Sequence, residues 1–373
     1  MIPVLLVQSN ATSKALKSTL SNHATQASIV QAHSLMIQQQ PSIDLSSFKN
    51  LKPFQTDINN TISGAKQHAT TYLNIILPAM IKQTTNMDGY FNVQNALGAA
   101  LNPDEDAKKA VALIKIAQDK AQQYKTDATG LVQRLNTLRT NFSTDASNFT
   151  TYTGKLNAAV NGDNGLMKSI DGTLSSMDGD IAGAITGIAL SGLTILAGGL
   201  MIAVGAIAEL VTAGTSTALV VAGVGVAAAG VAGEVASSIT LSNLLDEKGK
   251  LLAQKSSLTA EVNFALGLTS NFKMIAGSAK GAAAATQDMA SAWTTLENHL
   301  GNLSSSLEQG KTTVDDVRRL FQAAAKGDVK NIQHDLSTIE QQLSGVRQDI
   351  NTNKSPGVII RESLPKKALQ QAA

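Results

Sequence analysis

The sequence of 373 residues contains no cysteine, which excludes a disulfide framework, a cysteine nucleophile and a zinc site with thiolate ligands. Aromatic residues make up only 3% of the chain, so an aromatic-rich globular core is not expected. Most of the remaining residues are Ala, Leu, Ser, Thr, Gln, Asn, Asp and Lys. This mixture is typical of long amphipathic helices that pack through small and aliphatic side chains.

The chain also lacks an excess of charge of either sign, because 30 Lys and Arg residues face 28 Asp and Glu residues. Nucleic-acid binding depends on clustered positive charge, so no nucleic-acid partner is expected. The stretch from Met1 to Val7 has no positive charge and is too short an apolar run for a usual signal peptide. Export, if it occurs, is expected to use another route, unless a signal was removed before this numbering begins.

No arrangement of residues in the sequence indicates catalysis. The glycines form no phosphate-binding loop, dinucleotide fingerprint or nucleophile elbow. The five histidines share no metal-ligand spacing, and each is expected to be a solvated helix residue: His23, His33, His68, His299 and His334. We therefore expect no enzymatic activity, no metal and no cofactor.

Two apolar segments near the middle of the chain are unlike the rest of it. Ile181 to Ala208 and Leu210 to Gly233 both lack charged residues, and only Glu209 separates them. A bilayer core about 30 Å thick requires roughly 20 apolar residues in helical form. Each segment is therefore able to span a membrane or to pack as a buried hairpin. Within the second segment, the run from Leu219 to Val226 fits a β-tongue as well as a helix.

We predict that these segments enter a membrane as a hairpin. Its tip is predicted at Glu209 and Gly214, since a carboxylate at the bilayer centre is costly. Small residues spaced four apart favour close helix packing in lipid, and this role is assigned to Gly183, Gly187, Gly199 and Gly233. The predicted inserting residues are Ile181, Ile185, Ile188, Leu190, Leu193, Ile195, Leu196, Leu200, Ile202, Val204, Leu219, Val220, Val221, Val224, Val226 and Val231.

Long helices are predicted on both sides of the hairpin. From Pro103 to about Val160, apolar residues keep a seven-residue register with Asp145 as the one polar break. Asn102 is expected to cap this helix, which would be on the order of 85 Å long. A second register runs from Leu244 to about Gln309, with Thr286 as its polar member. The two helices are expected to pair as an antiparallel rod.

Shorter helices are predicted over 10–40, over 53–85 with a kink at Pro78, from a turn at 86–89 to about Leu101, over 313–326 and over 329–350. Ser355-Pro356-Gly357 is expected to break the last helix. The predicted fold is all-α, with about five long antiparallel helices and a hydrophobic hairpin or tongue between the two longest. The predicted domains are a helical bundle from 1–160 and 244–353, a head from 161–243, and a tail from 354–373.

This layout resembles the α-helical pore-forming toxins of the cytolysin A superfamily, above all the tripartite haemolysin BL and non-haemolytic enterotoxin type. The resemblance is carried by helix lengths and by the segments 181–208 and 210–233, and not by a short motif. It implies a secreted, soluble component that binds target-cell membrane lipid, inserts its head, oligomerises and lyses cells. Only Thr186, Ser191, Thr194 and Glu209 offer a polar stripe for a pore lumen, so partner toxin subunits are expected.

Two alternatives from other classes of protein share part of this pattern. A secretion-system translocator also couples coiled coils to a hydrophobic hairpin, and it would require a chaperone and a needle-tip partner. A membrane-anchored coiled-coil scaffold would require detergent from the moment of synthesis. The toxin component is favoured because the layout, with a hydrophobic head inserted between the two longest helices, resembles that family.

Overall fold

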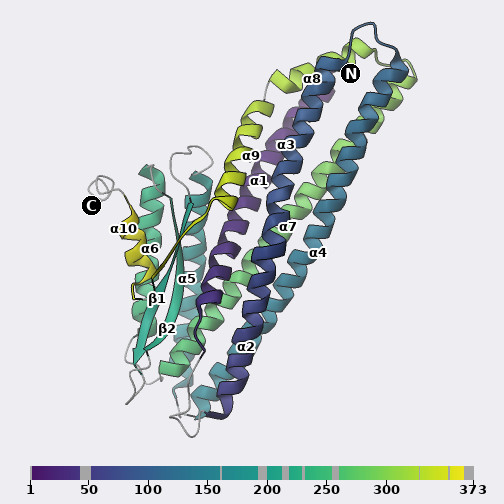
Figure 1. The fold of residues 1–373 in the computed structure, drawn as a ribbon. Helices are drawn as coiled ribbons and strands as arrows, with labels where there is room; N and C mark the ends of the chain where they lie inside the picture. The colour runs from purple at the N-terminus through teal and green to yellow at the C-terminus, as the bar shows by residue number, and fades with distance from the viewer. Residues whose placement is uncertain are drawn as a thin grey trace. The chain divides into compact units, whose positions relative to one another are not determined.

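The computed structural model describes residues 2–42, 52–159, 162–191, 200–211, 218–228, 232–253, 260–326, 328–351 and 353–364. Most of these residues are helical, and the predicted helical bundle with a hydrophobic tongue is confirmed (Figure 1). The elements are α1 (Ile2–Gln39), α2 (Lys52–Thr71), the π-helix η1 (Tyr72–Ile76), α3 (Leu77–Ala100), α4 (Ala107–Ala159), α5 (Asn164–Ser191), β1 (Leu200–Val211), β2 (Ala218–Ala228), α6 (Ala232–Ala253), α7 (Ala260–Glu308), α8 (Val314–Lys326), α9 (Asp328–Ser344), β3 (Arg347–Asn351) and α10 (Pro356–Ser363).

These elements divide between two compact units. Unit 1 comprises residues 1–24, 78–134 and 281–344, and unit 2 comprises residues 25–77, 135–280 and 345–373. The helices α1, α4 and α7 contribute residues to both units. The predicted division into bundle, head and tail follows other boundaries and stays a prediction.

The seven-residue register of α4 is confirmed, because its core positions are buried from Ile114 to Leu156. The predicted start of this helix is wrong by four residues. Asp106 accepts a hydrogen bond from the backbone N–H of Lys108 (3.0 Å) and thereby caps the helix. Pro103 and the acidic residue after it form a turn before the helix.

The second predicted long helix is two helices in the structure. Its register is confirmed in α7, where the core positions are buried from Ala265 to Leu307. The polar member Thr286 is buried as well, and its hydroxyl donates to the carbonyl of Ala282 (2.8 Å). Leu244 belongs to the separate helix α6, which packs on α5 and the strands. The heptad pattern continues across both helices, so it does not reveal their boundary.

The turn predicted at 86–89 is also wrong, because α3 continues through these residues. Met87 and Tyr90 are buried in unit 1, and their burial outweighs the local preference of an Asn-Met-Asp-Gly sequence for a turn. The predicted irregularity at Pro78 takes the form of a π-helix that ends two residues before it. Proline removes a backbone donor and clashes with the preceding turn, and a wider turn accommodates both effects.

Aromatic side chains form much of the core of unit 1. Trp293 of α7 is buried, and its ring centroid is 5.1 Å from those of Tyr90 on α3 and Tyr124 on α4. An ion pair between Lys125 and Glu297 joins α4 to α7 nearby (3.3 Å). Three aromatic residues of the chain therefore meet where three helices of this unit pack together.

Unit 2 contains a second aromatic cluster and explains the polar break in α4. Phe272 of α7 lies 6.4 Å from Phe142 and 5.1 Å from Phe149 between ring centroids. Asp145, on the same face of α4, is buried and pairs with Nδ1 of His68 on α2 (2.9 Å). A buried carboxylate requires such a partner, so the break in the heptad register is explained by an interhelical hydrogen bond between Asp145 and His68.

The C-terminal region departs from the sequence prediction. The predicted helix 329–350 ends at Ser344, and Arg347 to Asn351 form β3, in which Ile350 is exposed. Ser355-Pro356-Gly357 begins a helix instead of only breaking one. The hydroxyl of Ser355 caps α10 by accepting from the N–H of Val358 (3.2 Å), and proline suits the first helical position.

Candidate functional site

The two apolar segments meet as an antiparallel β-hairpin in unit 2. Register runs from Leu200 opposite Ala228 to Val211 opposite Ala218, with an irregularity between Ala206 and Ala208. The many β-branched residues of this region suit a pleated strand better than a helix. The structure therefore selects the β-tongue for the second segment and gives the same form to the end of the first.

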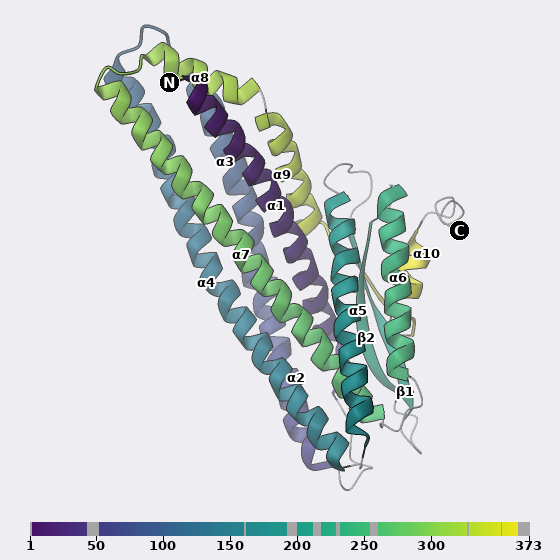
Figure 2. The ribbon, with the colours of Figure 1, turned by 180° about the vertical axis from the view of Figure 1, so that it is seen from behind.

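The tongue is covered on both faces at the one place where its side chains are described. Ile202 and Ala203 are consecutive in β1, so their side chains point to opposite faces of the sheet, and both are fully buried. The helices α6 and α10 contact both strands, and α5 contacts β2. Figures 1 and 2 show these helices flanking the strands. At this position of β1 the hairpin is thereby kept from water by its own chain.

A clasp formed by β3 and α10 holds one edge of the tongue. The strand β3 pairs in parallel with β1 from Met201 to Gly205, giving a sheet of order β2-β1-β3. An isolated two-stranded hairpin is only marginally stable in water. The clasp adds a third strand and covers the edge of β1, so it should stabilise the tongue.

The clasp is fixed to α6 by polar contacts around Asp246. The carboxylate of Asp246 pairs with Arg361 and accepts a hydrogen bond from the hydroxyl of Ser355 (3.0 Å). Ser242 donates its hydroxyl proton to the carbonyl of Gly357 (2.9 Å). A Cβ at Gly357 would lie 2.6 Å from the backbone oxygen of Ser242, so only glycine permits this approach.

A buried polar cluster joins the base of the tongue's helices to α7. The ammonium group of Lys248 on α6 donates to Asp178 on α5 (3.0 Å), and to Ser270 (2.8 Å) and Asn271 (3.0 Å) on α7. The hydroxyl of Ser270 donates in turn to the second carboxylate oxygen of Asp178 (2.6 Å). Lys248 is only 1% exposed. We call these four residues the polar lock.

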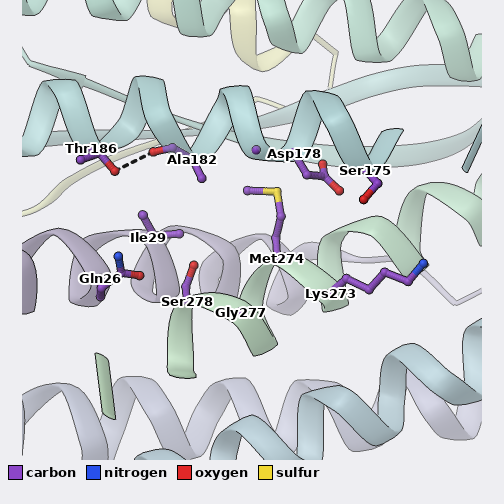
Figure 3. A pocket seen from close by; sticks show the side chains of 11 residues that line it. Gln26, Ile29, Ser175, Asp178, Ala182, Thr186, Lys273, Met274, Gly277 and Ser278 are labelled. Carbon is purple, nitrogen blue, oxygen red and sulfur yellow. Dashed lines mark hydrogen bonds between the residues drawn. The ribbon is translucent and has the colours of Figure 1, made fainter. Parts of the chain in front are cut away.

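A groove of about 340 Å³ lies beside the polar lock, between α1, α5 and α7 of unit 2 (Figure 3). Many of the residues that line the groove have small side chains. In Figure 3 the side chain of Met274 reaches from α7 toward α5. The lining residues are Gln26, Ile29, Ser175, Asp178, Gly179, Ala182, Thr186, Lys273, Met274, Gly277 and Ser278. The packing of α5 against this part of α7 is therefore incomplete.

Two histidines were expected to be solvated and are instead buried: His23 and His33. Burial and, to a smaller extent, nearby Lys248 lower the pKa of His33 from 6.5 to about 4, and Asp178 opposes this shift. Burial likewise lowers the pKa of His23 to about 4, opposed by its contact with the carbonyl of Met80. The prediction was wrong because both lie on faces of α1 that other helices cover. Among the described residues, no cluster of acidic residues or histidines is suited to hold a metal ion.

The predicted inserting residues fall into three groups. Ile181 and Ile185 are buried on α5. Ile188 and Leu190 also lie on α5, and Leu200, Ile202, Val204, Leu219, Val220, Val221, Val224 and Val226 lie in the two strands. Leu193, Ile195, Leu196 and Val231 lie outside the described residues. The structure thus places half of the sixteen predicted residues in one hairpin, and the insertion of all of them into lipid stays a prediction.

The predicted tip and packing glycines are placed as follows. Glu209 pairs with Val220 in the strand ladder, and Gly214 lies outside the described residues, as does Gly199. Gly183 and Gly187 are on α5 and Gly233 is on α6. A Cβ at Gly183 would meet nothing within 4 Å, so its predicted close packing is not present in this conformation. Within the described part of the chain, no helix is long and apolar enough to cross a membrane.

Comparison with known proteins identifies the family. A profile of the family described as Bacillus haemolytic enterotoxin (HBL) matches residues 10–184. Soluble AhlB of the tripartite α-pore-forming toxin AHL from Aeromonas hydrophila is 34% identical, with a TM-score of 0.87 over 93% of this chain and 98% of that chain. This chain belongs to the tripartite α-pore-forming toxin family.

Structures of relatives in this toxin family are known in two conformations, soluble and pore. Soluble SmhB from Serratia marcescens is 28% identical, with a TM-score of 0.87 over 96% of this chain and 99% of that chain. The AhlB pore is 31% identical, but its TM-score is only 0.62 over 90% of this chain and 99% of that chain. No curated protein sequence matches the chain. The conformation described for this toxin component is accordingly close to the soluble forms of its relatives.

Proposed function

We propose that this chain is the component of a tripartite toxin that delivers an apolar hairpin into the target-cell membrane. The observation that carries the proposal is the relation to AhlB, which is known both as a soluble protein and as a pore. The uncharged hairpin of this chain supplies the element that such a change requires. Family membership favours this function over the translocator and scaffold alternatives, and the proposed activity involves no catalysis.

The length of the hairpin indicates what must move during insertion. The 12 residues of β1 would span about 18 Å as a helix, which is less than the bilayer core of about 30 Å. A helix from Ile181 to Ala208 would span about 40 Å. A helix that spans the bilayer must therefore extend beyond β1 toward α5, and in the proposed inserted form the end of α5, with buried Ile181 and Ile185, joins β1 in one helix. The head must open before it can insert.

We further propose that partner subunits and further copies of this chain complete the pore. The relatives are components of tripartite toxins, and AhlB is known in pre-pore and pore forms. The hairpin of this chain has few polar residues to line a water-filled lumen. A separate component with a polar stripe would supply that lining. The chain is thus expected to act first as a soluble protein and then in the target membrane.

The test is co-sedimentation with red-cell ghosts, followed by proteolysis and mass mapping of the protected fragment. We expect residues 181–233 to be protected after binding, and lysis when the two partner components of the same toxin are added. Val221→Asp places a charge in the bilayer and should abolish lysis, since a carboxylate in hydrocarbon costs several kcal/mol. Thr240→Asp, at an exposed position of α6, is the matched control and should lyse normally.

Two results would contradict the proposal. One is cleavage within 181–233 in the membrane-bound protein at the rate seen in solution. The other is full lysis by Val221→Asp with all partner components present.

A further inference from the structure

The polar lock is a closed set of interactions that depends on three helices being in place. Each ammonium proton of Lys248 has an acceptor, and these acceptors lie on α5 and α7. Ser270 on α7 both accepts from Lys248 and donates to Asp178. A movement that separates α5 and α6 together from α7 removes Ser270 and Asn271 from Lys248 and removes Ser270 from Asp178, and a movement that separates α5 from α6 breaks the ion pair as well.

Such a cluster contributes more to the choice of conformation than to overall stability. Removing both ions of a buried pair from water offsets most of their mutual attraction, so replacing the pair by apolar groups is often neutral. Removing only one partner leaves an uncompensated buried charge, which is strongly unfavourable. The lock is therefore weak as a stabiliser but sensitive to any change in charge.

The lock also lies where the head must open. Asp178 is three residues before Ile181, the start of the uncharged segment that is proposed to join the membrane helix. The adjoining groove of about 340 Å³ has Gly179 and Ala182 on α5 and Gly277 on α7 among its lining residues. The groove shows that α5 and α7 are incompletely packed at this point, and the polar contacts of the lock link the two helices beside it.

His33 adds a third titratable group beside the ion pair. Its side chain is 3% exposed, and neither ring nitrogen has a hydrogen-bond partner among the described residues. The charged groups that act on it are Lys248 from α6 and Asp178 from α5, while α7 presents the neutral Ser270 and Asn271. Lys273 and Asp171, the nearby charged pair of α7 and α5, are exposed and pair with each other (3.3 Å).

A proton on His33 would place a second buried cation beside Lys248 with only Asp178 as a counter-anion. We propose that the polar lock keeps the toxin head closed in water, and that protonation of His33 in an acidic compartment or at an acidic membrane surface opens it. This inference rests on the proposed membrane insertion, whose onset it would regulate.

The lock is tested by Asp178→Asn, Lys248→Met and the double variant, with hydrogen exchange followed by mass spectrometry at pH 7.5. Each single variant should raise exchange in α5 and α6 at least about tenfold, because it leaves a buried charge or orphaned acceptors. The double variant should return exchange to within about threefold of the wild type. Exchange in α4 residues 107–134 and Trp293 fluorescence, both in unit 1, should stay unchanged and exclude global unfolding.

The acid response is tested by binding to phosphatidylcholine vesicles between pH 7.5 and 5. A histidine with a lowered folded pKa stabilises the closed form above its unfolded pKa of about 6.5, and this stabilisation is lost as the pH falls toward about 4. Wild-type binding should therefore increase toward pH 5, and His33→Gln should abolish this increase. His23→Gln, which removes the other buried histidine of α1 away from the lock, should retain it.

The outcomes separate the lock from the proposed function. The proposed role of the polar lock would be overturned if both single variants exchanged hydrogen in α5 and α6 at the wild-type rate. It would also be overturned if the double variant exchanged as fast as the single variants. An unchanged acid response in His33→Gln would overturn the role of this histidine. If exchange responds as expected but neither wild type nor variants bind vesicles or ghosts with all partner components present, the lock stands and membrane insertion is contradicted.

Discussion

Buried polar side chains decide several features of this toxin component at the scale of single residues. The ring of His23 has no exposed surface, and its Nε2 lies 3.4 Å from the carbonyl oxygen of Met80. Its Nδ1 lies 3.3 Å from the hydroxyl of Thr286 on α7. The contact with Met80 suits an imidazole that carries its proton on Nε2, and burial disfavours the doubly protonated form.

His23 should make the stability of the protein depend on pH. Its pKa is about 4 in the folded state and 6.5 when solvated, so its contribution is complete above pH 6.5 and is lost as the pH falls toward 4. The free energy of unfolding should decrease by up to about 3 kcal/mol from this residue over that range. His23→Gln should flatten the pH dependence measured by urea denaturation. An identical slope in the variant would show that His23 does not titrate on unfolding.

Gly357 should tolerate no side chain. A Cβ there would lie 2.5 Å from Oδ1 of Asp246 and 2.6 Å from the backbone oxygen of Ser242, so α10 would have to shift. We expect Gly357→Ala to cost about 1–3 kcal/mol in thermal or chemical denaturation. Gly64→Ala in α2 is the control, because a Cβ there meets nothing within 4 Å. It should stabilise the helix by about 0.5–1 kcal/mol. A Gly357→Ala variant as stable as the wild type would refute the steric argument.

At the scale of elements, the apolar segment of β1 is a strand in this structure and is predicted to be a helix in lipid. The β-hairpin satisfies its backbone groups through β3 and through pairing of β1 with β2. In a bilayer without such partners, only a helix satisfies every backbone group within one segment. The surroundings of the segment, rather than its sequence alone, therefore select its secondary structure.

Removing the clasp should expose the tongue. A chain ending at Gly345 lacks β3 and α10, so the edge of β1 and part of its face lose their cover. We expect increased binding of the dye ANS and self-association at neutral pH, without loss of the helical circular dichroism signal. Arg361→Ala, which removes one ion pair but retains both elements, should show a much smaller increase. A truncated protein that binds no more dye than the full chain would show that the clasp is dispensable.

The transition of the whole molecule requires helices to separate, and the absence of cysteine makes this directly testable. Asp171 on α5 and Lys273 on α7 form an exposed ion pair (3.3 Å). Replacing both with cysteine and joining the thiols with a cleavable cross-linker should abolish lysis of red cells in the presence of the partner components. Cleaving the linker should restore it. Asp171→Cys carrying the same reagent on one thiol should remain lytic.

Activity of the cross-linked protein before cleavage would show that α5 does not need to leave α7. The result is interpretable only if mass spectrometry confirms that both thiols of each molecule are joined.

Much of this architecture is determined by the sequence alone. The seven-residue registers of α4 and α7 predict the two longest helices, since a helix of that periodicity must bury one face. The uncharged segments predict the hairpin between them, and the resemblance to pore-forming toxins rests on this order of elements. Local patterns of this kind are visible because they repeat along the chain.

Only the tertiary structure decided which polar groups are buried. It also decided that the apolar segments form a β-hairpin in this conformation. Asp145 interrupts its register because His68 lies opposite it, and Lys248 is buried because Asp178 and α7 surround it. The strand β3 forms after Ser344 because the edge of β1, far away in the sequence, accepts it. Each of these outcomes depends on a partner distant in the chain, and periodicity carries no information about such partners.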